Sequence, residues 1–438
     1  MRRSIRPPGL SVTRRALLAL PFALPFAGAA RAAARAIEFR RTFFAGAYFD
    51  PATAPSSQMM TYLVGPLTNR SSAPRGPPAN GNELTPFVRD LLTRDGRLQA
   101  AINLQFGADE GNPVALYLAR AQHDVYSFRA NPSAPLLVET VVSIALSLDV
   151  FTDQAAWSSA RRFESLFSEL LVFEVPSETD VPLDSAALAA TYKMAFTGAV
   201  HRLIERAVPQ LHIDRTLAKA AFQVTEFRLQ PQMSVQMSAV LTDGLAAAGL
   251  AADAPAMDRE RRLLKRELSH MLNQAIVNEL QRRAVRDIVM LPPESPWSDG
   301  HVLNVLRNRL GAPTDIKLVN SIPDVGIAAY DVIGATLADV DQLHHAEGGV
   351  ESRVYGVRLA ARIMRTPPGG AAYQVPSNIA DPNRKTALGT AGEPYLEIAG
   401  ATRSSRREVV LDAFRAATRD LAGPAVDLMV MTAKEINR

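Results

Sequence analysis

Hydrophobic positions alternate with small or polar ones most regularly over residues 140–151, TVVSIALSLDVF. One face of this segment carries Val142, Ile144, Leu146, Leu148 and Val150, and the other carries Ser143, Ala145, Ser147 and Asp149. A period of two is typical of a β-strand, so the pattern predicts a half-buried antiparallel strand. Residues 162–176 are a candidate for its hairpin partner, although their pattern also allows a helix.

Two helices are expected in the first half of the chain from the spacing of their apolar positions. Thr85 and Pro86 favour a helix start, as a cap residue followed by proline at the first helical position, and Gly96 favours its end. A second helix is expected over about 185–208, with one apolar stripe formed by Leu188, Tyr192, Ala195, Ala199, Leu203 and Ala207. The other segments of this half are a strand at 38–50, a loop at 66–83 rich in Pro, Gly, Ser and Asn, and a strand at 97–106.

The second half of the chain shows a similar order of patterns. A long helix is expected over 258–286, and Ser405 with Glu408 forms a capping box at the start of a final helix. Between them the patterns predict strands at 286–293, 315–321, 330–340, 353–364 and 371–375, and a helix at 301–311. The alternation at 353–364 is the longest of these, so we expect one long strand there.

Strands that alternate with helices, together with long antiparallel hairpins, indicate a mixed α/β (α+β) fold. Both halves run in the order strand, helix, strand, long alternating strand, return strand and long helix. We therefore expect two similar lobes with partly antiparallel sheets flanked by helices. The expected boundaries are 1–36 for a leader, 37–208 for the first lobe, 209–286 for a helix-rich bridge and 287–438 for the second lobe. No residue-level identity links the halves, so their origin by duplication stays open.

The amino terminus has the pattern of a secretory signal peptide. A basic stretch precedes apolar residues from Ala16 to Ala29, which are too few and too interrupted by proline to span a membrane. Arg14 and Arg15, with Leu17 two places further on, resemble a twin-arginine export signal. The sequence therefore predicts an exported bacterial protein, periplasmic or secreted, with no transmembrane span after removal of the leader.

The leader also determines the sign of the net charge. The full chain carries a formal charge of +4, but residues 1–36 contain seven arginines and no acid, which leaves −3 for the rest. Binding of nucleic acid, which a basic chain would favour, thereby loses its main support. The chain contains no cysteine, which excludes disulfides, thiolate catalysis, cysteine-ligated zinc and an amino-terminal lipid anchor.

Three features follow one another in the second half: a strand that ends at Pro292, a strand with the step Gly334-Ala335-Thr336-Leu337, and a turn at Gly369-Gly370. In this order, and with a closing amphipathic helix, residues 286–421 resemble the amino-terminal domain of TolB and the curli-assembly (CsgG-like) class of bacterial envelope proteins. The resemblance covers about a third of the chain. It implies an adaptor or assembly role in the periplasm, through protein contacts and without catalysis.

Candidate metal ligands concentrate at residues 341–349, DQLHHAEGG. His344 and His345 are adjacent, and Asp341 and Glu347 flank them. Adjacent side chains point to opposite faces of a strand and diverge by roughly 100° on a helix, so a shared ion would need ligands from elsewhere. The pattern favours a polar loop tip, with a metal site as the alternative.

Other histidines are paired with acids. Glu267 and His270 have the Glu-x-x-His spacing of di-metal helical bundles, but the motif occurs once, on the polar side of its helix, so we expect a solvated face. Two further pairs are His123-Asp124 and His212-x-Asp214. Such pairs can orient a general base, but no nucleophile motif, phosphate-binding loop or dinucleotide fingerprint accompanies them. We expect ordinary surface or capping roles for both.

These observations predict an exported accessory protein that binds envelope or periplasmic proteins, without catalysis, cofactor or metal. Self-association into a homo-oligomer stays open. The alternative is an exported metal-dependent hydrolase centred on His344 and His345, and a third hypothesis is a twin-arginine substrate with an organic cofactor. A hydrolase should gather polar side chains in a pocket, whereas an adaptor should expose an apolar patch.

Overall fold

The computed structural model describes residues 42–49, 84–107, 111–128, 133, 135–151, 162–211, 217–248, 251–295, 297, 317–320, 328–336, 342–347, 350–356, 359–366, 395–398 and 406–436. All of them belong to one unit, residues 36–438, so a division into two lobes is not confirmed. The leader, the loop at 66–83, the helix at 301–311, the strand at 371–375 and the cap residue Ser405 lie outside the described residues.

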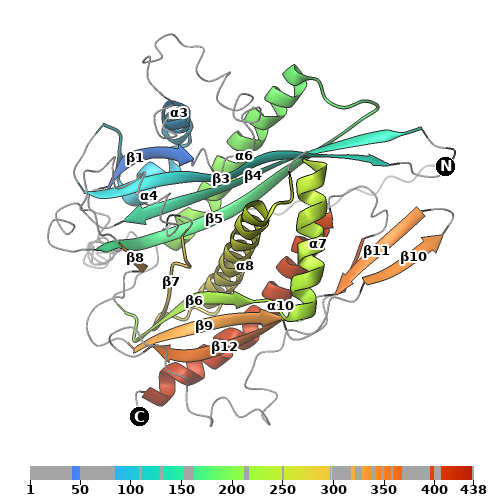
Figure 1. The fold of residues 1–438 in the computed structure, drawn as a ribbon. Coiled ribbons are helices and arrows are strands. Elements are labelled where there is room, and N and C mark those ends of the chain that lie inside the picture. The colour runs from blue at the N-terminus through green and yellow to red at the C-terminus, as the bar shows by residue number, and fades with distance from the viewer. Residues whose placement is uncertain are drawn as a thin grey trace, which may run out of the picture. The chain divides into compact units, whose positions relative to one another are not determined.

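The first sheet has six strands in the order β2-β1-β3-β4-β5-β8 (Figure 1). Its strands are β1 (Thr42–Phe49), β2 (Leu104–Gln105), β3 (Asn112–Phe128), β4 (Leu137–Phe151), β5 (Arg162–Thr179) and β8 (Lys317–Asn320). Strand β1 pairs in parallel with β2 and β3, whereas β3, β4 and β5 form an antiparallel meander. The hairpin expected from residues 140–176 is therefore confirmed.

One face of the first sheet is covered by α3 (Thr85–Asp95), α4 (Arg97–Ile102) and α6 (Ser185–Leu211). The apolar stripe of α6 is buried against the even-numbered side chains of β4, as the period of each segment predicts. Gly96 ends α3 in the left-handed conformation at φ 69°, which glycine adopts without steric cost. Thr85 does not cap α3; its Oγ1 accepts from Ala47 N–H at 2.9 Å and donates to Ala47 O at 3.2 Å, so it ties the helix to β1.

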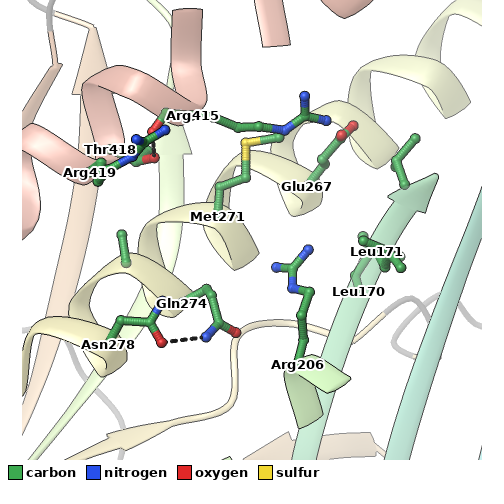
Figure 2. Close-up of a pocket in the computed structure, with 12 residues that line it drawn as sticks. Leu170, Leu171, Arg206, Glu267, Met271, Gln274, Asn278, Arg415, Thr418 and Arg419 are labelled. Carbon is green, nitrogen blue, oxygen red and sulfur yellow. Dashed lines mark hydrogen bonds between the residues drawn. The ribbon is translucent and has the colours of Figure 1, made fainter. Parts of the chain in front are cut away.

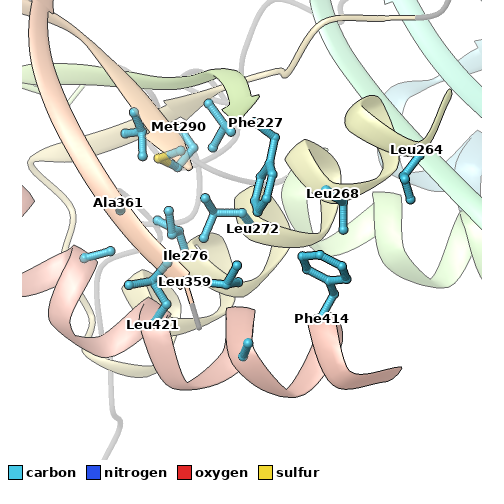
Figure 3. Packing of buried hydrophobic residues seen from close by; sticks show 14 of the residues in the cluster. Phe227, Leu264, Leu268, Leu272, Ile276, Met290, Leu359, Ala361, Phe414 and Leu421 are labelled. Carbon is cyan, nitrogen blue, oxygen red and sulfur yellow. The ribbon is translucent and has the colours of Figure 1, made fainter. Parts of the chain in front are cut away.

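The second sheet has four strands in the order β12-β9-β6-β7. It consists of β6 (Ala220–Arg228), β7 (Ile288–Leu291), β9 (Ala328–Thr336) and β12 (Leu359–Thr366). Its core lies against α7 (Pro231–Ala247), α8 (Ala254–Arg282) and α10 (Arg406–Ile436). Figure 3 shows Leu268, Leu272 and Ile276 of α8 packed between the sheet and the side chains Phe414 and Leu421 of α10.

Strand pairing follows the same pattern in the two sheets. In the first sheet β1 pairs in parallel with β2 and β3, and β3 continues antiparallel with β4. In the second sheet β6 pairs in parallel with β7 and β9, and β9 continues antiparallel with β12. The helix-rich segment 209–286 contains α7 and α8, but it also contains β6, the strand on which the second sheet is built.

Three secondary-structure predictions are wrong. Residues 97–102 form the helix α4, and only Leu104–Gln105 are extended, because Leu98 and Ile102 are buried on one helical face. The strand expected over 353–364 is two strands of different sheets, since β11 (Val350–Gly356) pairs with β10 (Gln342–Glu347) and β13 (Tyr395–Ile398), and β12 pairs with β9. Strand β4 is buried on both faces rather than one.

Candidate functional site

The second face of the first sheet packs against α8 through polar side chains. We use the name polar layer for buried polar residues on this side of the first sheet and on α8: Arg120, Gln122, Asp124, Ser143, Ser147, Asp149 and Ser168 on the strands, and Glu260, Glu267 and His270 on the helix. A small apolar cluster of Ala145, Leu170, Val172 and Leu263 shows that these faces meet. Helix α8 thus packs its apolar side on the second sheet and its polar side on the first.

Glu267 and His270, expected on a solvated face, are buried with exposed fractions of 3% and 0%. The prediction is wrong because the polar side of α8 faces the first sheet instead of water. A buried ionisable group needs specific partners, and burial disfavours its charged form. The Glu-x-x-His pair therefore occupies the interior of the molecule, where each side chain has a defined role.

His270 supports the outer edge of β5. The Leu170 N–H donates to His270 Nδ1 at 3.2 Å, and His270 Nε2 lies 3.4 Å from the carbonyl oxygen of Glu294. Burial lowers the pKa of His270 to about 3, so the ring is neutral at physiological pH. Because Nδ1 accepts, the proton is on Nε2 and points at the carbonyl of Glu294.

Glu267 belongs to a cluster of buried charges in the polar layer. Arg120 forms an ion pair with Glu260, and both side chains are buried. Burial raises the pKa of Asp124 to about 7, against the opposing effect of the Arg120 charge. Burial likewise raises the pKa of Glu267 to about 7, although Arg120 and Arg415 favour its ionised form. These two carboxyl groups of the polar layer therefore titrate near neutral pH.

A pocket of about 300 Å³ opens where β5, α6, α8 and α10 meet, and Glu267 lines it (Figure 2). Three arginines contribute to the lining: Arg206 from α6 and Arg415 and Arg419 from α10. Figure 2 shows the Arg415 side chain extending toward Glu267. We call this site the arginine pocket.

The three arginines differ in how their charges are compensated. Arg206 forms an ion pair with the fully buried Glu169, with Nη2 and Oε1 2.7 Å apart, and Gln210 Nε2 donates to the other oxygen of Glu169 at 3.0 Å. Arg415 forms an ion pair with Asp412 one helical turn earlier. Arg419 is exposed and has no ion pair among the described residues. The pocket thus presents guanidinium groups suited to a carboxylate or phosphate.

The other histidine candidates are separated in the structure. His344 and His345 occupy neighbouring positions of β10, opposite Arg353 and Ser352 of β11. Because successive residues of a strand face opposite sides of a sheet, we do not expect the two histidines to bind one ion. Glu347 ends β10, and Asp341 lies outside the described residues. Across the described parts of the chain, no group of three or more acids and histidines is placed to hold a metal ion.

His123 and Asp124 do not form a catalytic pair. His123 Nδ1 lies 3.0 Å from the Tyr192 hydroxyl on the α6 side of the sheet, whereas Asp124 is buried in the polar layer on the other side. The expected surface role is wrong for Asp124. His212 and Asp214 lie outside the described residues.

The sequence analysis missed the arginines of the site. A signal existed for Arg120, which interrupts the apolar run of β3 and is a costly residue to bury unpaired. Arg206, Arg415 and Arg419 lie on helices far apart in the chain, and nothing in their local spacing joins them. Comparison with other proteins adds no assignment: no known family matches this chain, and no curated protein is similar to it.

Proposed function

We propose that this chain is an exported, periplasmic binding protein of the bacterial cell envelope that acts through contacts with other proteins. One observation carries the proposal: the outer edge of β5 borders the arginine pocket. β5 pairs with β4 up to Thr179, but with β8 only over Arg162–Ser165. Beyond Ser165 no described strand pairs with this edge. The N–H of Leu170 is taken by His270, so the backbone groups that this edge offers to a partner chain at the pocket are those of Val172.

The arginine pocket gathers polar side chains, as we expected of a hydrolase, but its chemistry favours binding. Its described lining contains no histidine, serine or cysteine. The hydroxyl of Thr418 donates to the Arg415 carbonyl oxygen at 3.0 Å, within its own helix. Glu267 therefore has no nucleophile beside it among these residues, and the guanidinium groups suit recognition of an anion.

Two of the positions on which the resemblance to envelope assembly proteins rests lie in the second sheet. β7 ends at Leu291, directly before Pro292, and β9 contains Gly334. A Cβ atom at Gly334 would lie 2.7 Å from Cδ2 of Phe227, so close packing requires glycine there. The expected turn at 369–370 lies outside the described residues.

The prediction that no segment spans a membrane is consistent with the helices of the structure. In the described part of the chain, no helix is long and apolar enough to cross a membrane.

Export is tested with residues 1–36 fused to green fluorescent protein. This reporter becomes fluorescent in the periplasm only when it is translocated already folded, as the twin-arginine route allows. We expect periplasmic fluorescence that is lost when Arg14 and Arg15 are both changed to lysine, and retained when Arg31 and Arg35 are changed in the same way. Fluorescence confined to the cytoplasm, or export that tolerates the Arg14→Lys and Arg15→Lys changes, would contradict this part of the proposal.

Protein contact at the pocket is tested by crosslinking in intact cells. Asn278 is exposed at the pocket, so a photo-reactive phenylalanine analogue placed there should yield a discrete adduct with a second protein. The same analogue at Met194, exposed on α6 outside the pocket lining, is the control. We expect the adduct at position 278 alone and its loss in Arg419→Glu. Identical adducts from both positions, or none at 278, would refute the proposed contact.

A further inference from the structure

We propose that the arginine pocket binds an extended acidic segment of the partner protein, which adds to the outer edge of β5 as a further strand and places a carboxylate on the arginines of α10. This inference rests on the proposed function, because it names the chemistry of the partner. It is carried by three observations: the backbone direction at the β5 edge, the charges around the pocket, and a chain of amide hydrogen bonds that ends at its mouth.

The outward backbone groups of β5 border the pocket. In an antiparallel pair, alternate residues direct their N–H and C=O groups toward the neighbouring strand and away from it. Leu170 directs its N–H away from β4, since it donates to His270 Nδ1. Val172 has the same parity and lines the pocket, so its backbone groups point outward beside the cavity.

Pro176 gives independent support for this direction. It shares the parity of Leu170 and Val172 and lies within the regular pairing of β5 with β4. Proline lacks an N–H and is tolerated in a sheet where that position faces an open edge. A proline at this place in β5 therefore costs no hydrogen bond to β4. Its position is consistent with an outer edge of β5 that is left for a partner strand.

The charges around the pocket select an acidic ligand. Arg206 is compensated by Glu169 and Arg415 by Asp412, whereas Arg419 has no ion pair among the described residues. Arginine binds a carboxylate through two parallel hydrogen bonds, which makes Arg419 the group most free to do so. Glu267 is the one acid of the described lining, and its raised pKa reduces the charge that it opposes to an incoming carboxylate.

Amide side chains add neutral donors to the same mouth. Gln210 Nε2 donates to Gln274 Oε1 at 2.6 Å, and Gln274 Nε2 donates to Asn278 Oδ1 at 2.8 Å. This chain fixes the orientation of the Gln274 amide beside the pocket and ends at Asn278 on its exposed rim. A cavity of about 300 Å³ is at the lower end of the range for ligand sites, roughly 300–1,000 Å³, and fits a short segment.

The experiment uses fluorescence anisotropy with the purified protein and a labelled peptide that alternates glutamate and valine. We expect saturable binding that is weakened about tenfold or more by Arg419→Glu, which replaces a charge-assisted hydrogen bond with repulsion. Arg89→Glu, at an exposed site on α3, makes the same change of charge and should leave binding unaltered. The matched peptide of alternating lysine and valine should not bind.

Strand addition is tested separately by methylating the peptide backbone. In an extended peptide the N–H groups of the valines point to one edge and those of the glutamates to the other. Methylation of all valine nitrogens or of all glutamate nitrogens should therefore abolish binding in one case and spare it in the other. If both methylated peptides bind equally, or if free glutamate displaces the peptide at equal concentration, strand addition is refuted and the site takes small anions.

Failure of this inference is distinguishable from failure of the proposed function. A crosslink at position 278 without binding of the acidic peptide would leave the protein contact in place and refute the acidic ligand. Binding of the peptide that depends on Arg419, without any crosslinked partner in cells, would retain the chemistry of the pocket and refute the envelope contact.

Discussion

Replacing Trp297 by alanine is expected to lower the free energy of unfolding by about 3–5 kcal/mol, the usual cost of removing a large buried aromatic side chain. Trp297 has an exposed fraction of 0%. Its ring centroid lies 5.2 Å from that of Tyr117, 5.6 Å from that of Tyr48 and 6.2 Å from that of Phe151. Urea unfolding followed by circular dichroism measures the loss.

The variant Trp297→Phe separates packing from hydrogen bonding. It retains an aromatic ring but removes the indole N–H, which donates to Asp149 Oδ2 at 2.9 Å. Asp149 is buried and keeps a donor in Ser147, whose hydroxyl lies 2.7 Å from the same oxygen. We therefore expect a smaller loss, about 1–3 kcal/mol. A loss below about 1 kcal/mol in Trp297→Ala would show that the aromatic cluster contributes little to the stability of the folded protein.

Parts of the fold with one clear period were predictable from the sequence. The alternation at 140–151 identified β4, and the stripe from Leu188 to Ala207 identified α6, because each has a buried apolar face of a single period. Short or continuous patterns were not predictable. The break between β11 and β12 falls inside one regular alternation, and the strand β3 was not predicted at all.

Two residues of the candidate site were noticed in the sequence, but its arginines and its surroundings were not predictable. The Glu-x-x-His spacing drew attention to Glu267 and His270, yet the sequence placed them in water. One face of β4 carries small and polar side chains, and this lets the polar side of α8 approach the first sheet and bury Glu267 and His270. The sequence shows each polar face separately, and each alone is typical of a solvated surface. Only the tertiary structure pairs them.

Ionisation of the polar layer should make the protein less stable as the pH rises from about 4 to about 7. Glu267 and Asp124 have pKa values raised to about 7 by burial, well above the ordinary values of 4.5 and 3.8. Below those ordinary values each carboxyl group is protonated in both the folded and the unfolded protein, and its contribution to the free energy of unfolding is fully present. As the pH rises, the unfolded state ionises first, so the folded state loses stability relative to it until the folded pKa is passed.

Histidines act in the opposite direction, so the effect is measured as a difference between proteins. Burial lowers the pKa values of His270 and His123, which makes stability rise with pH below about 6.5. The variant Glu267→Gln keeps both histidines and removes one titrating carboxyl. Around that carboxyl, Arg120 and Arg415 favour ionisation, whereas Glu174 and Glu260 oppose it.

The unfolding free energy of Glu267→Gln, minus that of the unchanged protein, should therefore increase between about pH 4 and pH 8. One pKa unit corresponds to about 1.4 kcal/mol, so the expected increase is roughly 3 kcal/mol. Glu279→Gln is the matched control, because Arg282 and Arg283 lower the pKa of Glu279 to about 2. Its effect on stability falls mainly below about pH 5 and has the opposite sign, so the control difference should decrease slightly over this range. Urea unfolding at the two pH values measures both differences. A difference for Glu267→Gln that stays constant would mean that Glu267 is already ionised in the folded protein, with Arg120 and Arg415 outweighing its burial.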